Sequence, residues 1–145
     1  MYASVDQAKE IYSLFRARKD FFPHTRFDYL KRKISANECI YLNDVVITFS
    51  RYKRAVKLGE CNASKGDYCL HQILNSNPGN GQSKSVIQKW ASTLELSSYI
   101  WLTVRTSNFT AKKFYDKIGF ERMGSIRWKQ GTIPGCVYKI KVSDV

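Results

Sequence analysis

The chain has 145 residues, of which 43% are hydrophobic and 25% are charged, and this length and composition fit one soluble globular domain spanning residues 1–145. No apolar run approaches the roughly 20 residues of a membrane span, so composition excludes a helical membrane protein. Lys and Arg number 24 against 12 Asp and Glu, and the formal charge of +12 favours a polyanionic partner or ligand. A basic surface that only aids solubility is the alternative, and composition does not choose between them.

The four cysteines form no metal-binding or redox motif. Cys39, Cys61, Cys69 and Cys136 are scattered, and no pair has the short spacing of such a motif. The first six residues lack a basic region followed by an apolar stretch, so we expect no secretory signal. We therefore expect a cytoplasmic protein with reduced thiols and no metal.

Start signals and apolar spacing predict two helices at the beginning of the chain. Ser4-Val5-Asp6-Gln7 has the pattern of a capping box, and apolar residues recur at helical spacing from Ala8 to Phe15. Pro23 separates this helix from a second one, which has a similar start signal at Thr25. The apolar stripe of the second helix consists of Phe27, Leu30 and Ile34.

Strands are expected next. Asn43-Asp44 lies between two apolar runs, residues 40–42 and 45–49, and this pattern predicts a hairpin. Further strands are expected over about 54–58, 67–74, 99–104, 121–128 and 135–142.

Two more helices complete the prediction. One follows a loop over residues 75–81 and carries an apolar stripe from Val86 to Leu94. The other runs from Asn108 to Ile118, and Gly119 ends it. The order of elements predicts an α/β (α+β) fold with one mixed, mostly antiparallel sheet flanked by about four helices.

A glycine-rich loop leads directly into the third helix. Gly79 and Gly81 permit tight turns and close ligand approach. The first N–H groups of a helix have no intrahelical acceptor, so a loop of this kind can bind an anion such as a pyrophosphate. The spacing matches neither a P-loop nor a dinucleotide fingerprint. A turn that only caps the helix explains the loop equally well when it is taken alone.

A second motif spans Val104 to Phe120. An apolar strand ends in a polar stretch, and a short helix follows with an Ala, a Phe-Tyr pair and a Gly-Phe stop. The joint pattern resembles a signature of the GNAT family, the acyl-CoA-dependent N-acyltransferases, and it is carried by Asn108, Ala111, Tyr115, Gly119 and Phe120. The loop at Gly79 and Gly81 is similar to the pyrophosphate loop of the same family. The resemblance covers about the second half of the chain, from Tyr68 to Tyr138.

The resemblance implies an enzyme that transfers an acetyl group from acetyl-CoA to a primary amine. Asn108 would contact the pantetheine arm, and Tyr115 would protonate the thiolate that leaves. The strand before the glycine loop would splay from its neighbour, and pantetheine would add to it like a further strand. The residues that would hold acetyl-CoA are Ile73, Leu74, Asn75, Gly79, Asn80, Gly81, Gln82, Ser83, Lys84 and Asn108. The alternative for Tyr115 is a core aromatic residue.

The chain departs from the family pattern in three places. Ser76 stands where the family has Gln or Arg, and Pro78, which has no N–H, precedes the first glycine of the loop. GNAT domains open with a strand, whereas only residues 1–5 precede the first helix here, so we expect that strand to be short or missing.

The acceptor half of the reaction is less defined. A general base is expected on the strand before the loop or on the one before that, and His71, Asp67 and Glu60 are the candidates. A structural hydrogen bond is the alternative for His71. No acyl-enzyme is needed, so we expect Cys69 to be a buried thiol.

The positive charge leaves the partner open. Basic residues interleaved with aromatic ones crowd the first half of the chain, which suggests an acidic or nucleic-acid acceptor. Three hypotheses follow: an amine acetyltransferase, an enzyme of the same chemistry that modifies a nucleic-acid base, and a non-catalytic basic binding module. The sequence indicates no membrane partner and does not define an oligomeric state.

Overall fold

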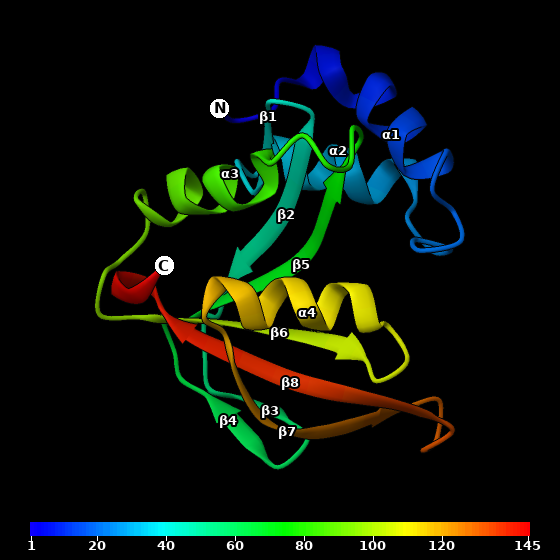
Figure 1. Cartoon of the computed structure of the whole chain (residues 1–145). Coiled ribbons are helices and arrows are strands. Elements are labelled where there is room, and N and C mark those ends of the chain that lie inside the picture. The colour runs from blue at the N-terminus through cyan, green and yellow to red at the C-terminus, as the bar shows by residue number, and fades with distance from the viewer. The chain divides into compact units, whose positions relative to one another are not determined.

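A computed structural model describes all 145 residues (Figure 1). It contains four α-helices, eight strands and two short 3-10 helices. None of the helices has both the length and the apolar character that a membrane crossing requires. The helices are α1 (Ala8–Arg16), α2 (Phe27–Ser35), α3 (Gln82–Ala91) and α4 (Phe109–Ile118). The strands are β1 (Cys39–Leu42), β2 (Val45–Arg51), β3 (Val56–Leu58), β4 (Cys61–Ala63), β5 (Tyr68–Asn75), β6 (Tyr99–Arg105), β7 (Glu121–Trp128) and β8 (Ile133–Lys141).

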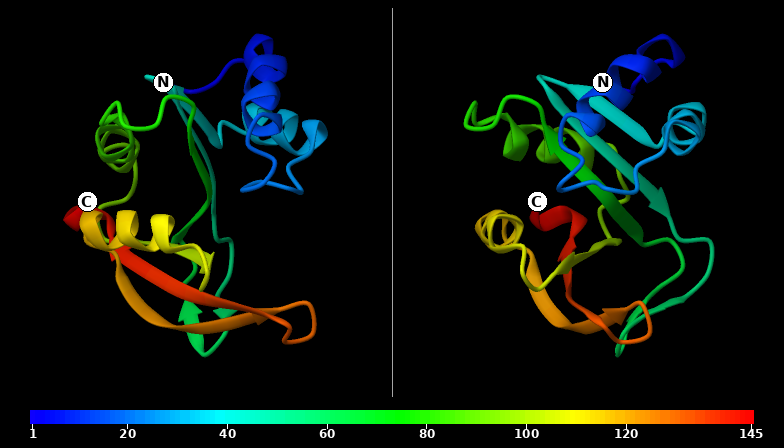
Figure 2. Two further views of the ribbon diagram at one scale, coloured as in Figure 1. Left: turned by 45° about the vertical axis from the view of Figure 1, so that its right-hand side comes forward. Right: turned by 90° about the vertical axis from the view of Figure 1, so that its right-hand side faces the viewer.

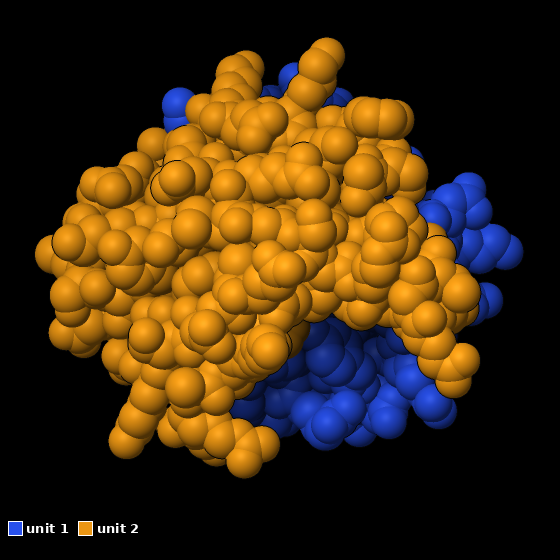
Figure 3. Space-filling model, turned by 90° about the horizontal axis from the view of Figure 1, so that it is seen from below, with its two compact units in different colours: residues 1–49, 72–87 blue, residues 50–71, 88–145 orange.

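Six strands form one sheet in the order β1-β2-β5-β6-β8-β7, while β3 and β4 form a separate two-stranded sheet. The chain divides into two compact units, which Figure 3 colours separately. Unit 1 contains Met1–Phe49 and Gln72–Ile87, and unit 2 contains Ser50–His71 and Gln88–Val145. Both β5 and α3 continue from one unit into the other.

Unit 1 is built on the hairpin of β1 and β2. Its two-residue turn places Asn43 and Asp44 at φ values of 49° and 69°, the left-handed conformation that a tight hairpin turn requires. Helices α1 and α2 cover one side of these strands, and the beginning of α3 lies on the other side (Figure 2). The core under α1 and α2 contains Ile11, Phe15, Leu30, Ile34, Val46 and Leu74.

Unit 2 is a sheet with different covers on its two faces (Figure 1). Strand β8 pairs antiparallel with both β6 and β7, and β5 joins β6 in parallel at Tyr68↔Ile100 and Cys69↔Trp101. Helix α4 covers one face, where the ring of Tyr115 contacts the ring of Tyr138 at 6.3 Å. The β3–β4 hairpin covers the other face, where Ala63 packs with Trp101 and Val137.

The predicted fold class is confirmed: the structure is a mixed α+β fold with a mostly antiparallel sheet and four helices. The splayed strand pair and the single domain remain predictions. The expected first strand is reduced to an isolated bridge between Tyr2 and Ile40, in agreement with the sequence. The capping box at Ser4 is also present, because the Ser4 N–H donates to Gln7 Oε1 (3.0 Å).

One detail of the sequence prediction is wrong. The strand expected over about 54–58 is only the first arm of a hairpin, and its second arm, β4, was not predicted. Each arm has three residues, which is too short for an alternating pattern to be recognised. The predicted closing strand is confirmed as β8, which begins at Ile133, two residues before the predicted start; Pro134 is its second residue, a position where proline is tolerated.

Candidate functional site

The glycine loop lies in unit 1, between the end of β5 and the start of α3. Gly79 and Gly81 have φ values of 87° and 74°, which side chains with a Cβ rarely adopt. A Cβ built on either residue would have no atom within 4 Å. The glycines are therefore required by the backbone conformation, and open space lies beside both.

Asparagine side chains hold this loop in shape. Asn75 Nδ2 donates to Asn80 Oδ1 (2.9 Å) and to Ser83 Oγ (3.1 Å). Asn75 Oδ1 accepts from the Asn77 N–H (2.9 Å), and Asn80 Oδ1 accepts from the Gln82 N–H (3.0 Å). Asn75 and Asn80 remain predicted ligand-binding residues; their side chains bond within the loop, and the predicted role of Asn75 belongs to its backbone.

The start of α3 supplies the donors for an anion. Helix α3 begins at Gln82, and the first N–H groups of a helix have no acceptor inside it. One of them, at Gln82, is used by Asn80, which leaves the amides of Ser83 and Lys84 for a ligand. The Lys84 side chain is exposed and adds positive charge at the same place.

The last residues of β5 have distinct environments. Leu74 is buried against the core of α1 and α2, so only its backbone groups can serve a ligand. Ile73 is half-buried. Gln72 is part of a polar chain: its Nε2 donates to Thr25 Oγ1 (2.6 Å), and its Oε1 accepts from Thr48 Oγ1 (3.1 Å).

Asn108 and Tyr115 lie in unit 2 on the same helix. Asn108 is the N-cap of α4, and its Oδ1 accepts from the Ala111 N–H (3.1 Å). This bond explains the Asn-x-x-Ala spacing, because it satisfies one of the helix-start donors. The helix ends at Gly119, and the Phe120 N–H donates to the Tyr115 carbonyl (3.0 Å). The cap and the stop together fix the position of Tyr115 along the helix.

Tyr115 is buried among aromatic rings. Its ring contacts Phe114, Phe120 and Tyr138 at centroid distances of 5.6, 5.5 and 6.3 Å, and it is only 7% exposed. Burial raises the pKa of the Tyr115 phenol above its usual range, because the apolar surroundings disfavour the phenolate.

Asp67 has a structural role. Its carboxylate accepts from the backbone N–H groups of Ser64 (2.9 Å) and Tyr99 (3.1 Å) and from Trp101 Nε1 (2.9 Å). The side chain is buried, with 6% exposure. Because three donors already engage this carboxylate, we do not retain Asp67 as a general base.

His71 lies in a small polar cluster of unit 2. His71 Nε2 is 2.8 Å from Ser50 Oγ, and His71 Nδ1 is 3.6 Å from Cys69 Sγ. The imidazole is exposed, and Cys69 is half-buried, so Cys69 is not the fully buried thiol that we expected. Ser50 was not anticipated from the sequence, because a serine near the end of a strand carries no recognisable signal. Glu60 lies in the exposed turn between β3 and β4.

No group of His, Cys, Asp and Glu side chains in the structure could hold a metal ion. The predicted residues 73–84 thus come together in unit 1, whereas Asp67, His71, Asn108 and Tyr115 belong to unit 2.

Comparison with solved structures shows the fold. Ard1 from Thermoplasma volcanium has a TM-score of 0.72 at 15% identity, over 97% of this chain and 95% of that chain. A GNAT-family acetyltransferase from Bacillus cereus has a TM-score of 0.69 at 19% identity, over 97% and 94%. The structure described as AAC(6')-Ib in complex with Parmomycin and AcetylCoA has a TM-score of 0.70 at 14% identity, over 99% and 93%. No protein-family model and no curated protein matches the sequence. The chain therefore has the fold of the GNAT acetyltransferases.

Proposed function

We propose that this protein is an acyl-CoA-dependent N-acyltransferase that transfers an acetyl group from acetyl-CoA to a primary amine. One observation carries the proposal. On a GNAT fold, a glycine loop precedes α3, and α4, which is capped by Asn108, carries the buried Tyr115. A similar fold in a complex with AcetylCoA supports acetyl-CoA as the co-substrate.

Contacts to acetyl-CoA are proposed within each unit separately. In unit 1, the amides of Gly79, Gly81, Ser83 and Lys84 would hold the pyrophosphate, since they lie in or beside the glycine loop and the helix start. Pro78 has no N–H to donate, so these amides and the charge of Lys84 would bind the pyrophosphate without it. In unit 2, the Nδ2 group of Asn108 would contact pantetheine, because Oδ1 already caps α4.

The reaction would proceed by direct attack of the amine on the thioester. The amine nitrogen forms a bond to the carbonyl carbon, and the bond from that carbon to sulfur breaks. Tyr115 donates its proton to the coenzyme A thiolate. The proton lost by the amine goes to His71, whose ring Ser50 orients; imidazole is the side chain suited to this role near neutral pH.

Calorimetry with coenzyme A tests the donor site. We expect the unaltered protein to bind and Gly81→Asp to lose binding, because the new carboxylate would stand where the pyrophosphate charge is held. Gly131→Asp is the matched control: Gly131 also has a positive φ of 87° with open space beside it, but it lies in the β7–β8 turn. No heat of binding with coenzyme A at millimolar concentration would refute the proposal.

Mass spectrometry tests the reaction itself. Candidate amine pools are incubated with the protein and acetyl-CoA, and the expected result is an acetylated amine that requires both. A protein that binds coenzyme A but acetylates none of the pools would have the donor site without the proposed transfer.

A further inference from the structure

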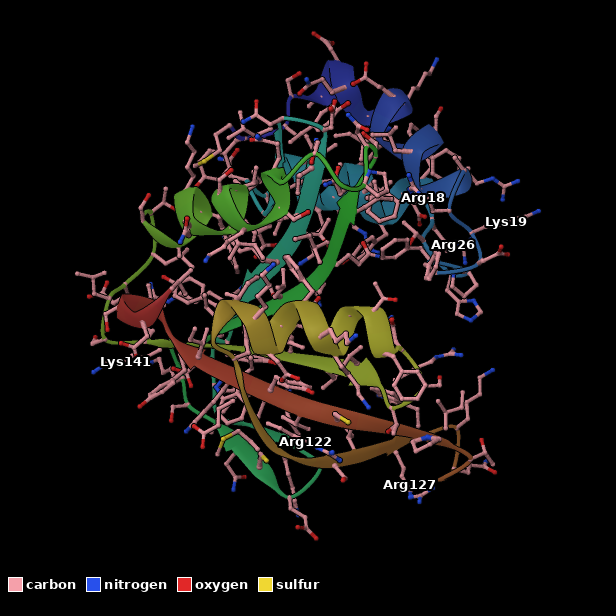
Figure 4. All side chains as sticks on the ribbon, in the orientation of Figure 1. Arg18, Lys19, Arg26, Arg122, Arg127 and Lys141 are labelled. Atoms are coloured by element: carbon pink, nitrogen blue, oxygen red, sulfur yellow. The ribbon has the colours of Figure 1, made fainter.

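The connection between α1 and α2, residues 17–26, has a surface that the proposed reaction leaves without a role. It carries four Arg, Lys or His side chains, and Figure 4 labels three of them. The four residues are Arg18, Lys19, His24 and Arg26, and the only acidic residue of the connection is Asp20. Arg26 also pairs with Asp28, at 3.6 Å between two highly exposed side chains, a geometry that neutralises little charge in water.

A large aromatic ring stands in the middle of this positive segment. Phe21 is 67% exposed, whereas its neighbour Phe22 packs edge-on against Phe15 at 5.0 Å. The turn itself is ordered, because the Arg18 carbonyl accepts from the N–H groups of both phenylalanines (3.0 Å each). The fold therefore packs the half-buried Phe22 ring against the core and leaves the Phe21 ring exposed in a basic segment.

The connection is fixed to the strand that precedes the glycine loop. Thr25 Oγ1 accepts from Gln72 Nε2 on β5 (2.6 Å), and Gln72 is linked through the fully buried Thr48 to Tyr29 on α2. Arg18 Nη2 donates to the carbonyl of Ser76, the residue that follows β5 (3.3 Å). A ligand bound on the connection would thus lie beside the end of β5 and the start of the glycine loop, all within unit 1.

An exposed aromatic ring in a basic segment fits a nucleotide. Aromatic side chains stack on bases of any sequence, and Lys and Arg bind the phosphates beside them. An acidic peptide would use the cations but leave the ring without a partner. A membrane surface would need more apolar side chains than one phenylalanine.

We propose that residues 17–26 bind the acceptor, and that the acceptor is a nucleotide within a single-stranded nucleic acid. Phe21 stacks on a base, and Lys19 and Arg26 contact flanking phosphates. This inference rests on the proposed function for the reaction, in which the amine carried by the nucleotide attacks the thioester. The binding surface itself can be tested without acyl-CoA.

Fluorescence anisotropy with a labelled single-stranded 12-mer measures the binding at several NaCl concentrations. Loss of one stacked base costs about 1–3 kcal/mol, so Phe21→Ala should weaken binding about 5- to 150-fold, and Phe21→Trp should retain it. The double variant Lys19→Ala, Arg26→Ala should lower the slope of log affinity against log salt by about 1.4, since each phosphate contact on a single strand contributes about 0.7.

Matched controls separate this surface from general charge and general apolar exposure. Leu96→Ala removes another highly exposed apolar side chain, at 63% exposure, and Lys9→Ala removes an exposed charge of α1 in the same unit. Both should leave the affinity and the salt slope unchanged. The inference is overturned by absence of binding at low salt, or by equal losses in Phe21→Ala and Leu96→Ala.

A competition experiment distinguishes a single-stranded nucleic acid from a free nucleotide as the ligand. A mononucleotide that displaces the 12-mer at equal concentration would refute a nucleic-acid strand as the ligand and leave a free nucleotide in its place. If the protein binds coenzyme A but not the 12-mer, only this inference is refuted. If it binds the 12-mer but not coenzyme A, the proposed acyltransferase function is refuted instead.

Discussion

Buried polar side chains in this protein differ in what surrounds them, and that difference decides their roles. Asp67 is engaged by three N–H donors, whereas the ring of Tyr115 lies among other aromatic rings, where burial raises the pKa of its phenol. A fully engaged carboxylate stabilises the fold. The proposed role of Tyr115 requires a neutral phenol, and the apolar surroundings disfavour its ionisation.

Removing the Tyr115 hydroxyl should affect turnover more than affinity. We expect Tyr115→Phe to lower kcat about 100-fold or more, with little change in coenzyme A binding, because proton donation acts only in the transition state. Steady-state kinetics measure kcat. Tyr138→Phe is the control, since Tyr138 is a buried phenol whose ring is 6.3 Å away; a larger loss in that variant would assign the proton to Tyr138 instead.

The raised pKa of Tyr115 also predicts a pH profile. In the proposed mechanism the acid form of Tyr115 is the active one, and an unperturbed tyrosine ionises near about pH 10. Because the pKa of Tyr115 is raised above that value, ionisation of this residue should cause no fall in kcat between neutral pH and about pH 10. A fall in kcat below about pH 10 that disappears in Tyr115→Phe would contradict the assignment.

Asp67→Asn should destabilise the fold. One of the two carboxylate oxygens becomes an NH2 group that faces N–H donors, so we expect the free energy of unfolding to drop by about 2–3 kcal/mol. Urea denaturation measures the change, and an unchanged slope with a lower midpoint is expected. The exposed carboxylate of Glu121 provides the control, since Glu121→Gln should change the midpoint little. An Asp67→Asn protein of normal stability would reopen Asp67 as a general base.

Among the secondary-structure elements, the short β3–β4 hairpin makes one close backbone contact with the main sheet. Gly59, in its turn, has a φ of 61°, and a Cβ there would collide with the Ser125 carbonyl oxygen of β7. The backbone of the hairpin therefore lies directly on β7. Glycine is required here by space as well as by conformation.

Gly59→Ala should detach the hairpin from the sheet. We expect a loss of stability of about 2 kcal/mol or more, since overpacking adds to the strain of a positive φ. The control is Gly131→Ala, where φ is 87° but no atom lies within 4 Å of the new Cβ, so only the strain remains. Equal urea midpoints for the two variants would show that the close contact contributes nothing.

For the whole molecule, the positive charge is distributed unevenly. Unit 2 has fifteen Lys and Arg residues against six Asp and Glu, and it carries +9 of the formal charge of +12. The ion pairs Arg26–Asp28 and Lys33–Glu38 both lie in unit 1. Concentrated charge of one sign repels itself and destabilises the compact state.

Screening should therefore stabilise the protein. Raising NaCl from about 0.05 M to about 0.5 M shortens the range of the repulsion, and we expect the midpoint of thermal unfolding to rise. Differential scanning calorimetry measures it. A midpoint that falls with salt would mean that attractive ion pairs outweigh the repulsion.

The sequence predicted those structural features that depend on interactions between residues close together in the chain. The Ser4 capping box, the Asn43-Asp44 turn and the stop at Gly119 all formed as predicted. Helix boundaries, hairpin turns and the Asn-x-x-Ala cap depend on residues within four positions of one another. For the same reason, the amino-acid pattern alone locates the glycine loop and the helix that carries Tyr115.

Contacts between distant segments were decided only by the tertiary structure. Asp67, His71 and Glu60 were all candidates for the base in the sequence, and bonds to Tyr99 and Trp101 from β6 gave Asp67 a structural role. The pairing of Ser50 with His71 and the link between Gln72 and Thr25 likewise join residues 21 and 47 positions apart. The sequence by itself determined most of the elements, the glycine loop and the capped helix that carries Tyr115, because short-range bonding specifies them. Which polar groups are engaged and which stay available depends on long-range packing, and only the folded chain shows it.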